Sequence, residues 1–235
     1  MKRKFHYVLQ AKGGVGKSLY TYLRALAEYD RSSLFVDVDH STKTSTRQLK
    51  FLGEARMESL SLVGKRDMIV RDIFIGYVES LADAPFDEIF MDFGAPESEQ
   101  FPALVSKDLN FKAWCDRLGN EVTFHIIIAG GGAYRACVEY LQKMIEVISG
   151  RFRIVVWQNL STFSELPQLS AELSDNCARF GVELRQFGDF DAGTLLGIQI
   201  LDGIRNGYRL DQYPFGAQIC LETELENNFS DEPGQ

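Results

Sequence analysis

A glycine-rich run near the start of the chain constrains the possible folds more than any other feature. It reads Ala11-Lys12-Gly13-Gly14-Val15-Gly16-Lys17-Ser18. Residues 5–10, which precede it, are mainly apolar and predict a strand, whereas residues 19–29 repeat apolar side chains at helical spacing. A strand, a glycine loop and a helix in this order form the setting in which such a loop binds phosphate.

Each residue type in the run suits that chemistry. Glycines let successive backbone N–H groups turn toward an anion that a Cβ would obstruct, and the helix that begins near Lys17 points its positive end at the same place. Lys17 can reach the β- and γ-phosphates, and the Ser18 hydroxyl can ligate Mg²⁺. The predicted nucleotide-binding residues are Gly13, Gly14, Val15, Gly16, Lys17, Ser18 and Leu19. The alternative is a glycine-rich turn with incidental lysines, which the extent and position of the match disfavour.

Two aspartates close the second apolar strand, which is predicted over residues 33–39. Ligands of an open α/β sheet lie at the carboxyl ends of its strands, so Asp37 and Asp39 are candidates to hold Mg²⁺ or to position a water molecule. A turn or helix-capping aspartate is the alternative for either residue alone. Their occurrence together with the phosphate-binding loop favours the functional interpretation.

Two further predicted strands also end in polar residues. Residues 86–94 end in Asp92-Phe93-Gly94, the form of a Walker B strand, in which the aspartate binds Mg²⁺ and the glycine lets the following loop move. This pattern alone is weak, because many buried strands end in such a turn. Residues 153–158 predict another strand, which Asn159 follows.

Strands and helices alternate along the chain, which predicts a doubly wound α/β domain with a mainly parallel sheet and helices on both faces. At least six strands are expected. The remaining expected strands cover residues 122–128 and 183–187, and the remaining expected helices cover 101–118, 134–148, 166–180 and 193–205. The pattern fixes no boundaries in residues 42–85, and it is mixed from residue 213 onward.

Length and composition indicate one domain. The chain has 235 residues, of which 45% are hydrophobic and 25% charged, as in an ordinary soluble globular protein. We expect a single domain over residues 1–235, with a flexible acidic tail from about residue 222. The four cysteines and three histidines are scattered, so reduced thiols are expected and a zinc site is not.

The lengths of the apolar runs and the net charge of the chain bear on membrane insertion, secretion and DNA binding. No apolar run approaches the ~20 residues needed to span a bilayer, and residues 5–9 are too short for a signal-peptide core. We therefore expect a cytoplasmic protein without stable membrane insertion. A net charge of -8 argues against a large DNA-binding surface. A local basic patch at Lys43, Arg47 and Lys50 stays open, although a solvated loop is the commoner explanation.

The run Lys12–Ser18 resembles the deviant Walker A box of the ParA/MinD superfamily of P-loop ATPases, in which a second lysine lies inside the loop. The strict Walker A pattern fails at its first position, where Ala11 replaces glycine. Residues 7–18 look most like the small ATPases of plasmid partition and conjugative transfer, such as the TraL-like group. The resemblance implies the P-loop NTPase fold of the SIMIBI type.

The resemblance also implies roles for individual residues. Lys12 would cross a dimer interface to the partner's nucleotide, and Asp39 would orient the attacking water. Asp92 would be the Walker B aspartate, and Asn159 could hydrogen-bond the adenine, although a turn asparagine is equally reasonable. Proline usually follows the second aspartate in the family, and His40 stands there instead, so the switch loop can differ in shape. The predicted catalytic residues are thus Lys12, Lys17 and Asp39, and the predicted metal ligands are Ser18, Asp92 and Asp37.

The implied function is that of an ATPase that binds ATP with Mg²⁺, forms an ATP-dependent homodimer and hydrolyses ATP slowly. Its nucleotide state would switch binding to a protein partner in plasmid partition, plasmid stability or conjugative DNA transfer. The acidic C-terminal residues make a MinD-like membrane-targeting helix improbable, and contact with DNA is possible but not supported by the net charge. Two alternatives remain: a P-loop small-molecule kinase or ligase, and a nucleotide-binding scaffold that no longer hydrolyses ATP.

Overall fold

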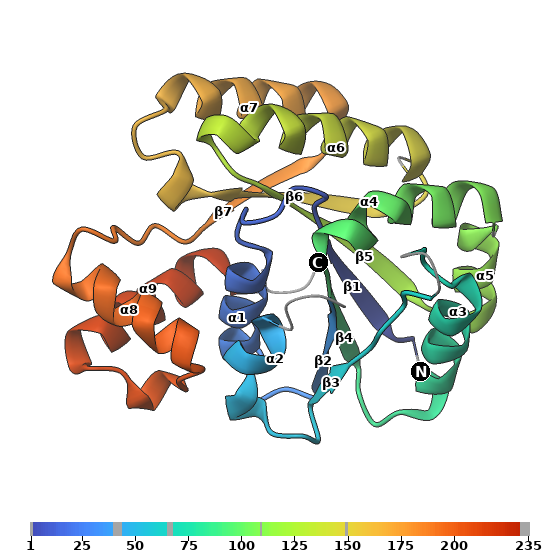
Figure 1. Ribbon diagram of the computed structural model, residues 1–235, viewed down its shortest axis with the longest axis horizontal. Helices are drawn as coiled ribbons and strands as arrows, with labels where there is room; N and C mark the ends of the chain where they lie inside the picture. The colour runs from blue at the N-terminus through green and yellow to red at the C-terminus, as the bar shows by residue number, and fades with distance from the viewer. Residues whose placement is uncertain (1, 40–43, 65–67, 109, 149, 231–235) are drawn as a thin grey trace.

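The protein forms a single sheet with helices on both faces (Figure 1). The computed structural model describes residues 2–39, 44–64, 68–108, 110–148 and 150–230. In this part of the chain the sheet has seven strands, all parallel, in the order β3-β2-β4-β1-β5-β6-β7. The strands are β1 (Lys4–Leu9), β2 (Ser33–Val38), β3 (Met57–Ser59), β4 (Glu88–Phe93), β5 (Glu121–Ile128), β6 (Arg153–Asn159) and β7 (Glu183–Phe187).

The strand order places β1 between β4 and β5, at the point where the connections of the sheet diverge. The chain leaves β1 for β2 and β3 on one side, returns through β4, and then continues through β5, β6 and β7 on the other side. In open sheets of this kind, ligands bind outside the carboxyl ends of the strands where the connections diverge. The loop that follows β1 begins at this place.

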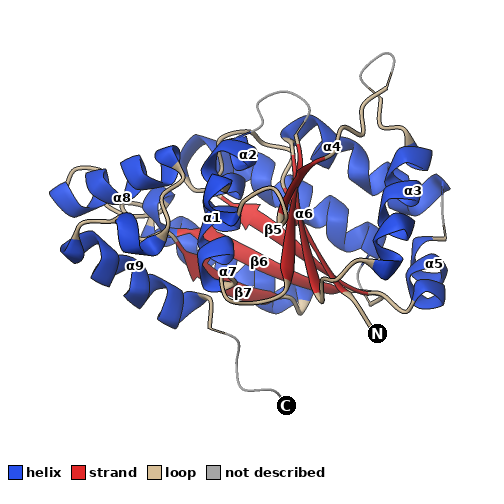
Figure 2. Cartoon of the chain, turned by 90° about the horizontal axis from the view of Figure 1, so that it is seen from below, coloured by secondary structure: helices blue, strands red, loops and turns tan. Residues whose placement is uncertain are grey.

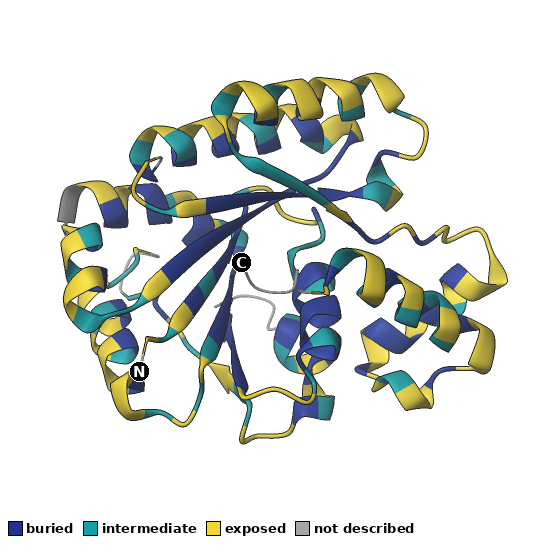
Figure 3. Ribbon diagram, turned by 180° about the vertical axis from the view of Figure 1, so that it is seen from behind, coloured by how far each residue is buried: buried dark blue, intermediate teal, exposed yellow. Residues whose placement is uncertain are grey.

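Nine α-helices cover the sheet within the described residues. They are α1 (Lys17–Ala27), α2 (Thr44–Gln48), α3 (Arg71–Ser80), α4 (Ala95–Ala103), α5 (Phe111–Leu118), α6 (Tyr134–Ile148), α7 (Pro167–Phe180), α8 (Leu195–Asn206) and α9 (Phe215–Asn228). Figure 2 shows the sheet between the helices, with α8 and α9 at the end of the molecule opposite α3 and α5. The five central strands are mostly buried, the edge strands β3 and β7 are partly exposed, and the outer surfaces of the helices are exposed (Figure 3).

Aromatic side chains pack on both faces of the sheet around β1, whose neighbouring residues point to opposite faces because side chains alternate along a strand. The ring of Tyr7 packs against Phe101 of α4 and Phe111 of α5, with ring centroids 5.6 and 6.3 Å away. On the opposite face, Tyr20 of α1 lies 4.8 Å from the Trp157 ring, and Trp157 stacks on Phe229 at 5.3 Å. Phe229, which directly follows α9, therefore packs in the core between α1 and the sheet.

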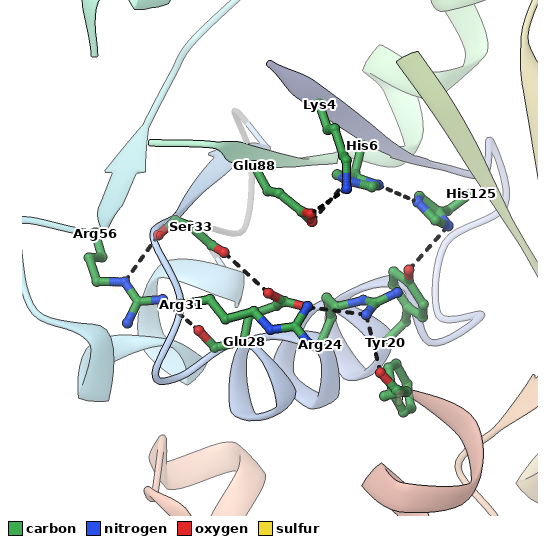
Figure 4. A network of polar contacts seen from close by, with 11 residues as sticks. Lys4, His6, Tyr20, Arg24, Glu28, Arg31, Ser33, Arg56, Glu88 and His125 are labelled. Carbon is green, nitrogen blue, oxygen red and sulfur yellow. Dashed lines mark hydrogen bonds and ion pairs between the residues drawn. The ribbon is translucent and has the colours of Figure 1, made fainter. Parts of the chain in front are cut away.

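A chain of buried polar side chains runs between α1 and the sheet (Figure 4). The indole N–H of Trp157 donates to Nδ1 of His125 over 3.0 Å, which assigns the proton of His125 to Nε2. That Nε2 lies 3.0 Å from Nδ1 of His6, and Nε2 of His6 lies 3.2 Å from a carboxylate oxygen of Glu88. Burial lowers the pKa of both histidines. These side-chain contacts join β6, β5, β1 and β4.

The fold class predicted from the sequence is confirmed, and most element boundaries agree within two residues. The helix at 134–148 and the strand at 183–187 coincide with α6 and β7. The single helix expected over 101–118 is wrong: α4 ends at Ala103, a π-helical turn covers Leu104–Asp108, and α5 begins at Phe111. Asn110 starts α5 by accepting a hydrogen bond from the backbone N–H of Ala113. The undivided region 42–85 contains α2, β3 and α3.

The C-terminal region differs most from expectation. A flexible tail was expected from about residue 222, whereas α9 continues through Glu222 to Asn228. Its anchor is Glu224, which is buried and accepts a 2.7 Å hydrogen bond from the backbone N–H of Gly188 after β7. Residues 231–235 lie outside the described residues. The acidic residues at 222–226 thus belong to a packed helix.

Candidate functional site

The glycine loop between β1 and α1 has a backbone that requires glycine at two positions. Gly14 has a φ of 75° and Gly16 a φ of 104°, in the region that side chains with a Cβ rarely adopt. At Gly16 a Cβ would also lie 2.5 Å from Nδ2 of Asn159. The loop therefore leads directly into α1, where its backbone N–H groups and the helix N-terminus can face one anion.

Gln10 holds the base of this loop, a role that the sequence reasoning missed. Its side chain is fully buried at the end of β1. Nε2 donates to the carbonyl oxygen of Ile127 over 2.9 Å, and Oε1 accepts from the backbone N–H of Lys12 over 3.3 Å. The Lys12 backbone is therefore fixed while its side chain is exposed to solvent. The sequence signal was a polar residue that ends an otherwise apolar strand.

The side chain of Lys17 connects the two ends of the loop. Its Nζ donates to the carbonyl oxygen of Gln10 over 3.0 Å. Burial lowers the pKa of Lys17, and the carboxylates of Asp92 and Asp39 oppose this change. The ammonium is thus directed into a site that also contains two carboxylates, where a bound polyphosphate would add further negative charge.

Ser18 and Asp92, two of the predicted Mg²⁺ ligands, lie within hydrogen-bond distance of each other. Oγ of Ser18 donates to Oδ2 of Asp92 over 3.1 Å, and Oγ of Ser45 donates to the same oxygen. Oδ1 of Asp92 is buried and has no hydrogen-bond partner among the described residues. Burial raises the pKa of Asp92 to about 6, although the Lys17 charge lowers it. A buried carboxylate with one unsatisfied oxygen is favourable for a cation.

These residues fit Mg²⁺ by their chemistry, because it prefers hard oxygen ligands. Ser18 supplies a hydroxyl and Asp92 supplies a carboxylate oxygen. Among the described residues, no three His, Cys, Asp or Glu side chains gather in a way that could hold a metal ion. An ion beside Asp92 would therefore take its other ligands from phosphate and water, as in nucleotide sites generally.

A cavity of about 400 Å³ brings most predicted site residues together. Asp39 lies in its wall, opposite the loop, and Gly94 lies beside it. A Cβ at Gly94 would lie 3.1 Å from Oδ1 of Asp39 and would collide with the Glu97 carboxylate. The lining residues are Gly13, Gly14, Val15, Gly16, Lys17, Ser18, Leu19, Asp39, Thr44, Asp92, Phe93, Gly94, Ala95 and Pro96. The ends of β2 and β4 thus face the loop across one cavity.

Asp37 has a different environment from that expected of a metal ligand. It is buried and is absent from the cavity lining. Its Oδ2 accepts hydrogen bonds from the backbone N–H and the hydroxyl of Thr46 over 2.8 and 2.7 Å, and its Oδ1 accepts from the backbone N–H of Asp39. The carboxylate thus positions α2 and Asp39, and its predicted contact with metal stays a prediction that these bonds do not favour.

Asn159 also serves the loop in this structure. Nδ2 donates to the carbonyl oxygen of Val15 over 3.0 Å, and Oδ1 accepts from the hydroxyl of Ser161 over 2.8 Å. The side chain is buried and does not line the cavity. Both ends of the amide are engaged, with Val15 and with Ser161, and the predicted contact with adenine stays untested.

Two sequence predictions fall partly outside the described residues. His40 and Lys43 belong to residues 40–43, whose structure is not described. Of the proposed basic patch, Arg47 and Lys50 are exposed. The backbone of Arg47 packs against Gly207, which follows α8. A Cβ at Gly207 would lie 2.7 Å from the carbonyl oxygen of Arg47.

Comparison with known proteins supports the resemblance. No protein-family model matches the chain. Two proteins named TraL from Escherichia coli are 27% and 29% identical to it over 166 and 167 residues. The match covers 66% of this chain and 63% of each relative, so the chain matches less than two thirds of the length of these proteins.

Solved structures share the fold. A chain of the MinC:MinD cell division protein complex of Aquifex aeolicus superimposes with a TM-score of 0.58 over 99% of this chain and 98% of its own length, at 14% identity. A putative plasmid partition protein of Borrelia burgdorferi, solved with AMPPNP, gives a TM-score of 0.50 over 87% of this chain and 97% of its own, at 13% identity. The chain therefore has a ParA/MinD-like fold and similarity to TraL.

In the part of the chain that the structure describes, no helix combines the length and the apolar character required to cross a membrane.

Proposed function

We propose that this protein is a Mg²⁺-dependent ATPase whose nucleotide state switches its association with a second copy and with a partner protein. One observation carries the proposal: Lys17, Ser18, Asp92 and Asp39 meet at one cavity, beside a loop whose glycines require positive φ. The ParA/MinD-like fold and the nucleotide-bound neighbour support this interpretation.

Each residue of the cavity has a separate role in this proposal. Lys17 and the backbone N–H groups of the loop would bind the phosphates, and Ser18 and Asp92 would hold Mg²⁺, which would supply positive charge beside the phosphate oxygens. Asp39 faces the loop from the end of β2 and orients the water that attacks the γ-phosphate. Hydrolysis then releases phosphate and leaves ADP in the site.

Lys12 is assigned to the dimer. Its side chain is exposed, whereas its backbone is fixed by Gln10. A second copy that closes over the loop would bring the lysine of each chain to the phosphates of the other. Positive charge there stabilises the charge that develops during phosphoryl transfer. ATP would therefore favour the dimer and its hydrolysis would reopen it.

The similarity to TraL and to plasmid partition proteins suggests the setting, which is conjugative DNA transfer or plasmid partition. In either setting the switch would act as a timer for partner binding, with the segments after Asp39 and Asp92 as the two elements that respond to the γ-phosphate.

Light scattering tests the proposal. We expect a monomer with ADP, a dimer with ATP and Mg²⁺, and a monomer with ATP for Lys12→Ala. Lys143→Ala, which removes an exposed lysine from α6, should dimerise like the wild type. ATP affinity should change little in Lys12→Ala, because Gln10 binds the Lys12 backbone and not its side chain.

Two results would contradict the proposal. A wild-type monomer under all conditions would exclude the nucleotide-dependent dimer, and a Lys12→Ala protein that still dimerises with ATP would remove the role of Lys12. Release of phosphate from ATP, measured on the same samples and on Lys17→Ala, tests hydrolysis separately.

A further inference from the structure

Exposed apolar side chains gather on the helical pair α8 and α9. Eight large apolar residues are exposed in the described part of the chain, and six of them lie between residues 195 and 219. Phe215 is 79% exposed and Leu195 69% exposed, values unusual for such side chains in a packed helix. The others in this region are Leu196, Ile198, Tyr208 and Ile219. A concentration of this kind marks an interaction surface more often than an ordinary exterior.

The first turns of the two helices meet. A Cβ at Gly216 would lie 3.1 Å from a methyl carbon of Leu196, so the first turn of α9 lies against the first turn of α8. Figures 1 and 2 show this helical pair projecting beyond β7 at one end of the molecule. We call Leu195, Leu196, Ile198, Phe215 and Ile219 the apolar patch. It lies at the junction of the two helices, and none of its residues lines the nucleotide cavity.

Helix α9 continues the apolar patch with acidic residues on the same stripe. Phe215, Ile219, Glu222 and Glu226 follow one another at spacings of four, three and four residues, which places them along one side of a helix. Glu226 is exposed and Glu222 is half-buried. The stripe is therefore apolar in its first half and negatively charged in its second half.

The surrounding charge has the same sign. Between residues 188 and 230 the chain has seven acidic and two basic residues. Both basic residues are already in ion pairs, Arg205 with Asp202 and Arg209 with Asp211. The acidic residues that remain near the surface are Asp189, Asp191, Glu222 and Glu226. The apolar patch thus has an anionic border.

We propose that the apolar patch and its acidic border bind a partner protein through an amphipathic helix that has an apolar stripe followed by lysine or arginine. Such a helix would place its apolar side chains on Phe215 and Ile219 and its cations beside Glu222 and Glu226. Helix-in-groove and helix-on-helix recognition use anchors at this spacing, and complementary charge selects the partner and its orientation.

The same charges disfavour two other occupants. A second copy of the chain would bring the two acidic borders together, which is unfavourable for like charges. An anionic lipid surface would be repelled by the same carboxylates, whereas membrane-binding helices carry lysine and arginine.

Synthetic peptides test the proposal with defined chemistry. The probe is a short fluorescent amphipathic peptide with a leucine stripe and lysines at its C-terminal end. Two matched peptides serve as controls: one has glutamate in place of lysine, and one has the lysine peptide's composition in scrambled order. We expect fluorescence anisotropy to show binding of the lysine peptide alone, and this binding should weaken with salt.

Variants of the protein locate the binding. Phe215→Ser combined with Ile219→Ser should weaken binding of the lysine peptide about tenfold or more, whereas Ile73→Ser, at an exposed apolar position on α3, should not. Glu222→Lys combined with Glu226→Lys should transfer the preference to the glutamate peptide. Glu146→Lys, at an exposed site on α6, is the charge control. All these positions are exposed or half-buried, so melting temperatures should stay close to that of the wild type.

Several outcomes would overturn the proposal. They are the absence of binding by the lysine peptide, equal binding of the scrambled peptide, and an unchanged preference in the charge-reversed protein. The same holds if light scattering shows that the apolar patch joins two copies, or if the wild type binds phosphatidylglycerol vesicles and Phe215→Ser with Ile219→Ser does not. Because peptide binding is measured without nucleotide, failure here leaves the ATPase proposal intact.

Discussion

The side-chain amide of Asn159 donates a 3.0 Å hydrogen bond to the carbonyl oxygen of Val15, so the end of β6 is bound directly to the middle of the glycine loop. The two residues are 144 positions apart in the chain. The contact makes the shape of the loop dependent on a strand two places away in the sheet, and it explains why Gly16 must lack a Cβ.

The first prediction distinguishes a loop anchor from an adenine ligand at Asn159. Asn159→Ala removes a buried hydrogen bond to the loop, which costs on the order of 1–3 kcal/mol. We expect the affinities for ATP and GTP to fall together, by about tenfold or more, as measured by calorimetry. A loss confined to ATP would show that the amide contacts adenine, contrary to the geometry described above.

The second prediction concerns Gly16. Gly16→Ala forces a Cβ into positive φ and against Asn159, at a cost of about 1–2 kcal/mol for the backbone alone. The melting temperature without nucleotide should therefore fall by several degrees. Gly13→Ala is the matched control, since no atom lies within 4 Å of a Cβ there. Equal melting temperatures for both variants would contradict the strain argument.

The third prediction follows from the pKa of Asp92. Burial raises that pKa to about 6 from an ordinary value of 3.8, so the folded protein binds this proton more tightly than the unfolded chain does. The resulting stabilisation is present at low pH and is lost as the pH rises through about 6. Asp92→Asn removes the buried charge. Without nucleotide, the variant should melt above the wild type at about pH 8, and the difference should fall to about half near pH 5, which lies between the two pKa values.

The same substitution should affect metal dependence. With one carboxylate oxygen removed, Mg²⁺ should no longer increase the affinity for ATP in Asp92→Asn, and calorimetry with and without Mg²⁺ would show this. Asp175→Asn, at an exposed site on α7, controls for the loss of a charge as such. A melting difference that is the same at both pH values would exclude titration of Asp92 as its cause.

The fourth prediction concerns the buried ion pair between Arg24 and Glu28 at the C-terminal end of α1 (Figure 4). Glu28 accepts hydrogen bonds from Arg24 and Arg31 through one oxygen and from Ser33 through the other. Glu28→Gln leaves a buried guanidinium without its carboxylate, which typically costs about 3–5 kcal/mol. Urea unfolding should show a loss of this size. Glu139→Gln breaks the exposed pair with Arg135, and a change within about 1 kcal/mol is expected there.

The local sequence pattern was sufficient to predict the main strands and the glycine loop. Buried parallel strands are short apolar runs, and the glycines between β1 and α1 restrict the loop whatever surrounds it. Short elements such as β3 and α2 were not resolved, because three to five residues carry no clear period. Helix α9 was missed for a related reason: Phe215 and Ile219 are exposed and Glu224 is buried, so apolar periodicity does not mark its packed face.

The sequence by itself determined that a glycine loop stands between a strand and a helix in a parallel α/β sheet, because glycine geometry and apolar periodicity are local properties. Only the tertiary structure decided what the polar residues at the strand ends do. Asp39 and Asp92 enter the cavity, whereas Asp37 and Asn159 bind backbone and hydroxyl groups from distant segments. The physical reason is that buried polar groups take whichever partners the packed chain brings within hydrogen-bond distance, and those partners lie far away in the sequence.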